Sequence, residues 1–194
     1  SGTAPGDLIF ADTNKDGVID DKDKCMIGNP HPDVTMGLTL NFGYKGFDLG
    51  ITTNAVFGNQ IAKSYRSFTD QPKENYTTDI LGRWHGEGTS NRLPRVASGT
   101  NVNWLYISDI FIEDGDYFRI QNVTLGYDFK KLFPRMPLGQ ARLYVTAQNL
   151  ATFTKYSGMD PEIGYGADKS WVSGIDVGFY PSPRTYMIGV NLKF

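Results

Sequence analysis

A two-residue alternation of apolar and polar side chains constrains this chain more than any other feature of its sequence. It is clearest from Arg184 to Phe194, RTYMIGVNLKF, where every second residue is large and apolar. Successive side chains of a strand point to opposite faces, so this segment predicts a strand with one apolar and one mostly polar face. A soluble domain rarely ends on a bare apolar strand, because its open edge invites aggregation. A transmembrane barrel pairs that edge and turns the apolar face to lipid.

The same alternation predicts four further strands, which makes the chain all-β. They cover residues 34–43, 47–55, 117–129 and 142–153. The first two are joined by a short turn in which Gly46 can supply a positive φ. Near Arg119 and Gln121 the alternation slips, which predicts a β-bulge or a barrel rim outside the membrane. The alternation alone does not separate a packed sandwich from a barrel with a wet interior, because both have one apolar face.

Two long polar connections, residues 57–115 and 156–183, alternate with shorter turns. Outer-membrane barrels have short periplasmic turns and long external loops, so we predict that both long connections are extracellular. Five strands cannot close such a barrel, because small barrels begin at about 8 strands. No signal peptide is visible at Ser1. We therefore expect residues 1–194 to be the C-terminal portion of a longer protein.

Composition excludes several classes of function. The formal net charge of −2 gives no basic footprint for nucleic acid. Cys25 is the only cysteine, so an intrachain disulfide or a cysteine-based metal cluster is excluded. The sequence carries no Ser/His/Asp arrangement, phosphate loop or metal-hydrolase signature, and we predict that the chain is not an enzyme.

The sharpest chemical motif is DTNKDGVIDDKD, residues 12–23, within a calcium-like segment that covers residues 7–27. Its oxygen donors have the spacing of a twelve-residue calcium loop, with Gly17 at the sharp turn. The candidate ligands are Asp12, Asn14, Asp16, the carbonyl of Val18, Asp20 and Asp23. Asp23 replaces the bidentate Glu of an EF-hand, and residues 7–11 predict a strand where an EF-hand has a helix. The motif predicts a strand-flanked calcium loop, and an Asp/Asn/Gly-rich turn that needs no metal is the alternative.

Aromatic side chains in the long connections are candidates for ligand binding, because a ring can stack on a sugar with little ordering. The candidates are Trp84, Trp104, Trp171 and Tyr180. The simpler interpretation is loop packing or contact with a partner protein. Arg92 and Arg95 could recognise carboxylates, and an exposed pair of loop cations is again the simpler interpretation.

Five ordered segments together resemble the SusC/RagA-type TonB-dependent outer-membrane transporters of the Bacteroidetes. They are PGDLIFADTNKDGVIDDKD, IGNPHPDVTMGLTLNFGYKGFDL, FIEDGDYFRIQNVTLGYDF, ARLYVTAQNLATFTKYSGMDPE and GIDVGFYPSPRTYMIGVNLKF. The resemblance covers nearly the whole chain except about residues 59–110. It implies the C-terminal strands of a 22-stranded antiparallel transmembrane β-barrel. The N-terminal plug, the TonB box and most strands of the family are missing here.

The resemblance also implies a function for the parent protein. That function is uptake of oligosaccharides or peptides across the outer membrane, with a SusD-like surface lipoprotein as lid. TonB would supply energy through the absent N-terminal part, and outer-membrane lipid would surround the barrel. The alternative is a soluble calcium-stabilised β domain that binds carbohydrate. A lipid-facing piece should aggregate without detergent, whereas a soluble module should stay monomeric.

Overall fold

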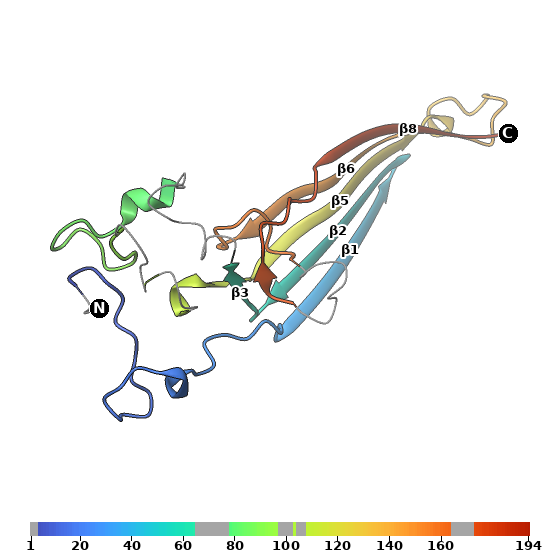
Figure 1. The fold of residues 1–194 in the computed structure, drawn as a ribbon. Helices are drawn as coiled ribbons and strands as arrows, with labels where there is room; N and C mark the ends of the chain where they lie inside the picture. The colour runs from blue at the N-terminus through green and yellow to red at the C-terminus, as the bar shows by residue number, and fades with distance from the viewer. Residues whose placement is uncertain (1–3, 65–77, 97–102, 104–107, 164–172) are drawn as a thin grey trace. The chain divides into compact units, whose positions relative to one another are not determined.

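The computed structural model describes residues 4–64, 78–96, 103, 108–163 and 173–194. The described chain consists of two β-sheets, irregular segments and short 3-10 helices (Figure 1). Among these residues, no helix is both long and apolar enough to cross a membrane. The chain divides into two compact units. The sheet unit comprises His31–Asn59, Asp114–Glu162 and Phe179–Phe194, and the loop unit comprises Ser1–Pro30, Gln60–Glu113 and Ile163–Gly178.

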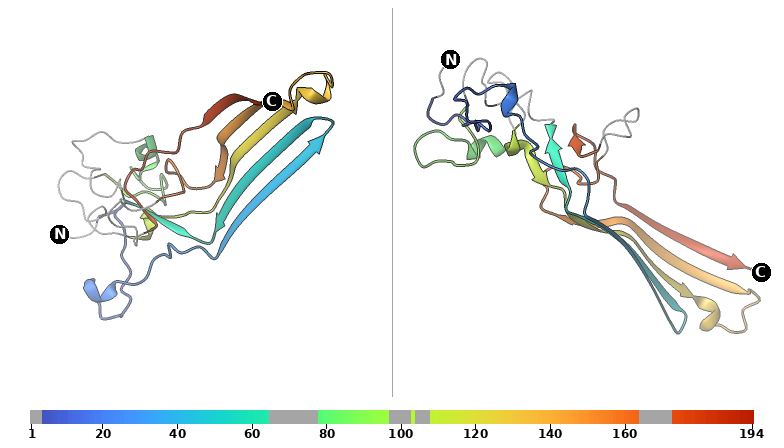
Figure 2. Two further views of the ribbon diagram at one scale, coloured as in Figure 1. Left: turned by 90° about the vertical axis from the view of Figure 1, so that its right-hand side faces the viewer. Right: turned by 90° about the horizontal axis from the view of Figure 1, so that it is seen from below.

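One antiparallel sheet of five strands makes up most of the sheet unit, and it confirms all five predicted strands. The strands are β1 (Val34–Tyr44), β2 (Phe47–Phe57), β5 (Tyr117–Asp128), β6 (Gln140–Thr154) and β8 (Thr185–Lys193). They lie in the order β1-β2-β5-β6-β8, so each pairs with its neighbours along the chain. Figure 2 shows them side by side as a long, curved ribbon of strands.

Short turns join the strands at one end of this sheet, which we call the turn end. Lys45 and Gly46 both have positive φ, 47° and 94°, and Tyr44 pairs with Phe47 across the turn. This is the backbone that matches the twist of a two-residue hairpin. Strands β5 and β6 are joined by η5 (Phe129–Lys131) and the residues up to Gly139, whose N–H donates to the carbonyl of Lys193. The opposite end of the sheet, where the long connections leave, is the loop end.

A β-bulge interrupts the sheet where the alternation of the sequence slips, as predicted. Between Thr52 and Thr53 of β2 the partner in β5 moves by two residues, which leaves Gln121 as an extra residue. The register between β5 and β6 shifts at the same place, where Asn149 has a positive φ of 51°. An extra residue bends a strand and changes which face its later side chains occupy.

The loop unit contains a small sheet with the order β4-β3-β7 and several one-turn helices. Its elements are η1 (Asp21–Asp23), β3 (Gln60–Lys63), η3 (Thr78–Gly82), η4 (Asp109–Phe111), β4 (Ile112–Asp114) and β7 (Ile175–Asp176). Strands β3 and β7 pair in parallel, and Ile61 between them is fully buried. Two polar residues are as deeply buried, Asn103 at 0% and Asp176 at 1% exposure.

The strand predicted at residues 7–11 is wrong, because this segment has no regular structure. The N–H of Leu8 donates to the side-chain oxygen of Asn103 at 2.7 Å. A side chain thus satisfies the backbone that a neighbouring strand would otherwise bind.

Candidate functional site

The apolar residues of all five long strands share one face of the sheet, which we call the apolar face. Directly paired residues lie on the same face, and one such row crosses the sheet through Leu40, Ile51, Val123, Ala147 and Tyr186. Large apolar side chains on this face are widely exposed. Those predicted to meet lipid, Leu38, Leu40, Ile188, Val190 and Leu192, are 39% to 73% exposed.

An apolar surface of this extent has a physical meaning. Soluble monomers rarely expose contiguous apolar patches above a few hundred Å², and larger ones mark contact with a membrane or another protein. The soluble alternative requires these side chains to be buried in a sandwich core. In the described part of the chain they are exposed on a single sheet, which favours the lipid-facing interpretation.

The opposite, polar face carries hydroxyl, amide and charged side chains. The hydroxyls of Thr124 and Thr146 lie 2.9 Å apart across β5 and β6. Near the turn end, Nε of Arg142 donates to Asp48 at 2.8 Å, and a second guanidinium nitrogen contacts the other carboxylate oxygen. This bidentate pair spans β2 and β6 over Gly126 of β5, where a Cβ would collide with the guanidinium. Such a face suits contact with water rather than with lipid.

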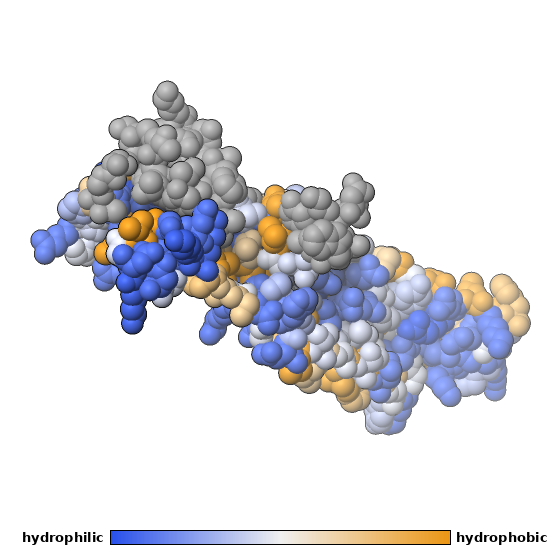
Figure 3. Space-filling model, turned by 60° about the horizontal axis from the view of Figure 1, so that its bottom comes forward, coloured by the Kyte–Doolittle hydropathy of each residue, from blue (hydrophilic) through white to orange (hydrophobic). Residues whose placement is uncertain are grey.

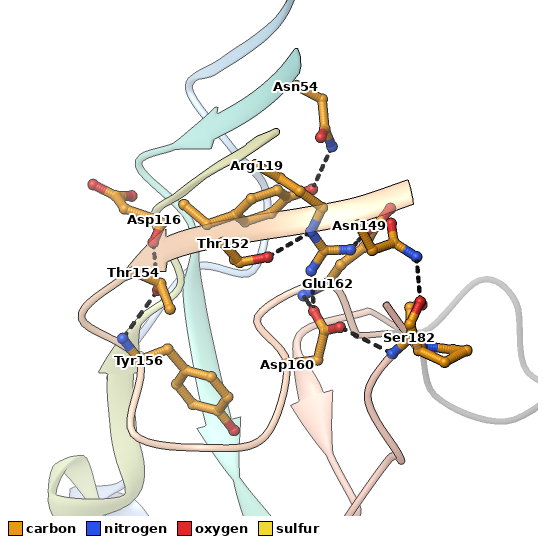
Figure 4. Close-up of polar contacts among 12 residues, drawn as sticks. Asn54, Asp116, Arg119, Asn149, Thr152, Thr154, Tyr156, Asp160, Glu162 and Ser182 are labelled. Carbon is orange, nitrogen blue, oxygen red and sulfur yellow. Dashed lines mark hydrogen bonds and ion pairs between the residues drawn. The ribbon is translucent and has the colours of Figure 1, made fainter. Parts of the chain in front are cut away.

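At the loop end, the polar face holds a buried arginine that sequence reasoning did not identify as a site. The guanidinium of Arg119 donates to Glu162 at 2.6 Å, to the hydroxyl of Thr152 at 2.9 Å and to Asp160 (Figure 4). The side chains of Arg119 and Asp160 are only 4% and 10% exposed, whereas that of Glu162 is 57% exposed. We call these four residues the Arg119 clamp.

The Arg119 clamp fixes the segment that follows β6. Asp160 also accepts from the N–H of Glu162 at 2.9 Å, so one carboxylate joins the strand to the turn of the segment. Nearby, the hydroxyl of Thr154 donates to the carbonyl of Asp116 at 2.7 Å, and Asn149 donates to the carbonyl of Pro183 at 3.1 Å. The residues around 156–162 are therefore anchored on the sheet by side chains of β5 and β6 (Figure 4).

The calcium-like loop of residues 12–23 is ordered by hydrogen bonds among its own groups. Asp12 accepts from the N–H of Gly17 at 2.8 Å, and Gly17 has a φ of 83°. Asn14 and Asp16 are hydrogen-bonded side chain to side chain at 2.9 Å, and Asp16 accepts from the N–H of Val18. The first part of the motif therefore gathers its oxygens within one turn.

Asp23 closes this loop. Its carboxylate accepts from the backbone N–H of Thr13 and of Asp20, each at 2.8 Å, and the N–H of Asp20 above all lowers the pKa of Asp23. Asp20 in turn caps η1 by accepting from the N–H of Lys22. Among the described residues, no group of three or more His, Cys, Asp or Glu side chains is placed to hold a metal ion. Closing a metal cage would require the carboxylates to turn away from these N–H groups.

A second polar cluster, also missed from the sequence, anchors the residues before the loop. Asp7 receives Nε of Arg95 at 2.7 Å, a second guanidinium nitrogen at 3.1 Å and the amide of Asn103 at 2.9 Å. The hydrogen bond from Arg95 is the main reason that the pKa of Asp7 falls to about 2. Arg95 is thus engaged in an internal ion pair, and the prediction of an exposed cation at this position is wrong.

The aromatic candidates for ligand binding lie in different surroundings. Trp84 is half-buried, and its ring lies so close to Gly6 that a Cβ there would collide with it. Tyr180 is 87% exposed in the sheet unit. Trp104 and Trp171 lie outside the described residues. The described candidates therefore form no shared binding surface, and their role in ligand binding stays a prediction.

Comparison with known proteins gives a consistent set of relatives. The chain is 36% identical to TonB-dependent receptor P3 of Formosa agariphila over 195 residues, and 35% identical to TonB-dependent receptor SusC of Bacteroides thetaiotaomicron over 192 residues. Each match covers 98% of this chain. The chain spans only 19% and 18% of the length of these relatives. No protein-family model matches the chain.

A solved structure agrees with these relatives. The RagAB peptide importer in its open-open state matches 84% of this chain with a TM-score of 0.65 and 26% sequence identity, over 17% of its own chain. TonB-dependent receptors are transporters and not enzymes, which confirms the prediction that the chain is not an enzyme.

Proposed function

Because the chain belongs to the SusC/RagA-type TonB-dependent receptors, we propose that it forms part of the barrel wall of an outer-membrane nutrient importer. The single observation that carries this proposal is the five-stranded sheet with one continuous, exposed apolar face and one polar face. A barrel wall needs this division, since one face meets hydrocarbon and the other meets the interior. In the proposed protein these strands are the C-terminal strands of a 22-stranded barrel.

The connections of the sheet support an orientation in the membrane. The turn end carries the short β1–β2 and β5–β6 connections and the residues that follow β8. In outer-membrane barrels short turns lie in the periplasm and long loops lie outside. The turn end is therefore periplasmic in our proposal, and the connections at 57–115 and 156–183 are extracellular.

The relatives also guide the choice of cargo and partners. One relative is SusC, and the matching RagAB structure is that of a peptide importer. We propose that the full-length protein imports oligosaccharides or peptides, is covered by a SusD-like surface lipoprotein and is driven by TonB. Exposed aromatic residues of the extracellular connections, such as Tyr180, are the candidates for contact with cargo or lid.

Labelling of neighbouring residues in β8 tests the placement of the two faces. Ile188 lies on the apolar face and Met187 on the polar face, and their side chains are 73% and 42% exposed. In a cysteine-free full-length receptor in bilayers, a fluorophore on Ile188→Cys should be quenched by brominated lipid. A fluorophore on Met187→Cys should escape that quenching and react with a hydrophilic thiol reagent. Equal behaviour of the two variants would refute the barrel-wall proposal.

We also propose that residues 12–23 bind one calcium ion. The support is the oxygen spacing of Asp12, Asn14, Asp16 and Asp23, with the Val18 carbonyl and Asp20 as further donors. Calcium prefers six to eight such oxygens, and Gly17 provides the turn that brings them together.

Calorimetry of the folded full-length receptor tests the metal proposal. Calcium should bind with a stoichiometry of one, and Asp16→Ala should abolish the heat of binding. Asp21→Ala removes an exposed carboxylate of the same loop that has no ligand position, so it should bind as the wild type does. Absence of binding to the wild type, or equal binding by Asp16→Ala, would show that the loop needs no metal.

A further inference from the structure

Three segments meet at the turn end of the five-stranded sheet. The N–H of Asp128 donates to the carbonyl of Gly46 at 2.8 Å, and a Cβ on Gly46 would touch Lys131 at 3.1 Å. The N–H of Gly139 donates to the carbonyl of Lys193 at 2.6 Å. The hairpin turn, residues 129–139 and the last residues of β8 therefore form one continuous surface, visible at the right of Figure 3.

This surface is strongly basic. Within the sheet unit, the turn end carries six cations, namely Lys45, Lys130, Lys131, Arg135, Arg142 and Lys193, against two acids, Asp48 and Asp128. The loop end carries the reverse excess, with five acids, namely Asp33, Asp114, Asp116, Asp160 and Glu162, against three cations, namely Arg119, Lys155 and Arg184. Charge is thus separated along the strands.

Both acids of the turn end are engaged inside the protein. Asp48 is bound by Arg142, and the carboxylate of Asp128 accepts from the N–H groups of Lys130 and Ala141 at 3.0 and 3.3 Å. One cation is also used internally, since the ammonium of Lys130 donates to the carbonyl of Met136 at 2.6 Å. The exposed cations Lys45, Lys131 and Arg135 are left to set the potential of the outer surface.

Aromatic and aliphatic side chains surround these three cations. Tyr44, which is 70% exposed, lies under the ammonium of Lys45 with 5.2 Å between the nitrogen and the ring centroid. Leu132 and Phe133 follow Lys131 directly and are more than half exposed. Amphipathic rings and long cationic side chains are the groups that settle at the boundary between hydrocarbon and phosphate headgroups.

From this juxtaposition we propose that Lys45, Lys131 and Arg135 form a binding site for the phosphate headgroups of anionic phospholipids at the periplasmic leaflet. The occupant follows from charge complementarity, because the surface combines three exposed cations with an apolar rim and its acids are internally bound. The proposal rests on the barrel placement proposed above. Each cation near an anionic membrane surface should strengthen binding about fivefold, and salt should weaken it within a Debye length of about 10 Å.

The test measures lipid selectivity of the full-length receptor. The receptor is reconstituted in phosphatidylcholine bilayers with trace spin-labelled phosphatidylglycerol or spin-labelled phosphatidylcholine, and electron paramagnetic resonance gives the ratio of their association constants. The wild type should prefer phosphatidylglycerol by at least fivefold, and 1 M salt should reduce this preference. The triple variant Lys45→Gln, Lys131→Gln, Arg135→Gln should bring the ratio close to one.

A matched control removes three exposed cations elsewhere, with Lys15→Gln, Lys22→Gln and Lys155→Gln. It should keep the preference of the wild type. A wild type without preference, or a triple variant that keeps it, would overturn the headgroup site and leave the surface to a periplasmic protein. Heat-modifiable migration of each sample reports barrel formation separately. A wild type that forms no barrel in the bilayer would instead refute the proposed function.

Discussion

The five-stranded sheet and the loop unit are held together by different kinds of interaction. In the sheet unit, continuous backbone ladders join the strands, and most large apolar side chains stay exposed. In the loop unit, strand pairing is short, and buried polar side chains such as Asn103, Asp176 and Lys63 connect distant segments. The comparison teaches that a wall can leave its apolar residues to lipid, whereas an irregular segment needs individual polar contacts to keep one conformation.

The Arg119 clamp is the place where the sheet unit uses the second kind of interaction, and we expect its loss to have the largest effect. Arg119→Met removes the cation and leaves the buried Asp160 without its charged partner. Removing one partner of a buried pair costs about 3–5 kcal/mol. Hydrogen exchange of the reconstituted full-length receptor should show lost protection around residues 155–162 while β1 and β2 stay protected.

A double variant makes the Arg119 prediction specific. Asp160→Asn in the Arg119→Met background removes the unpaired charge, and protection should partly return. If the double variant is as unprotected as the single one, the clamp acts through packing rather than through charge.

The second prediction concerns the two faces of the sheet. Ile188→Lys places an ammonium on the apolar face, which should cost about 2–4 kcal/mol if that face meets the bilayer interior. Met187→Lys places the same group on the polar face and should cost much less. Urea unfolding of the receptor in lipid bilayers measures both, and similar losses of unfolding free energy would remove the distinction between the faces.

The third prediction concerns the polar cluster of the loop unit. Because the pKa of Asp7 is depressed to about 2 in the folded protein, its ion pair stabilises the fold at pH values above the ordinary pKa of 3.8. This stability is lost as the pH falls from about 5 through about 2. We expect about 1–2 kcal/mol, since Arg95 is one-third exposed and solvent screens the pair.

Hydrogen exchange of the segment around Leu8 as a function of pH checks this value. Asp7→Asn should lower protection at pH 6 and match the wild type near pH 2. A constant difference between the two proteins at all pH values would mean that the ionisation of Asp7 contributes nothing.

The smallest expected effect lies in the middle of the sheet. Thr124→Val keeps the shape of the side chain and removes its hydroxyl contact with Thr146. A single cross-strand pair contributes about 0.2–1 kcal/mol, and the backbone ladder stays intact. Urea unfolding should therefore show a loss below about 1 kcal/mol, and a loss comparable to that of Arg119→Met would contradict the comparison made above.

Local patterns explain which parts of the fold could be predicted. Alternation is a property of neighbouring residues, so it correctly placed the five strands and even the slip near Gln121. It gave no information on partners far apart in sequence. Arg119 meets Asp160 and Glu162 at separations of 41 and 43 residues, and Leu8 meets Asn103 at a separation of 95 residues.

The candidate sites could be predicted only in part for the same reason. The spacing of oxygens in residues 12–23 is local and remains a prediction of calcium binding. The Arg119 clamp had a weak signal, namely a cation where the alternation slips and two acids around Pro161 later in the chain. Spacing alone could not join these two signals, because the contact depends on how the segment after β6 folds back.

The bulge at Gln121 also determines how sequences of this kind should be aligned. On one side of it the odd-numbered residues Val123 and Leu125 lie on the apolar face, and on the other side the even-numbered Phe118 and Ile120 do. Without the extra residue, parity would place Arg119 beside Val123. A one-residue gap at this point therefore records a change of phase in the strand. Closing that gap to improve a score would exchange wall and interior for every position beyond it.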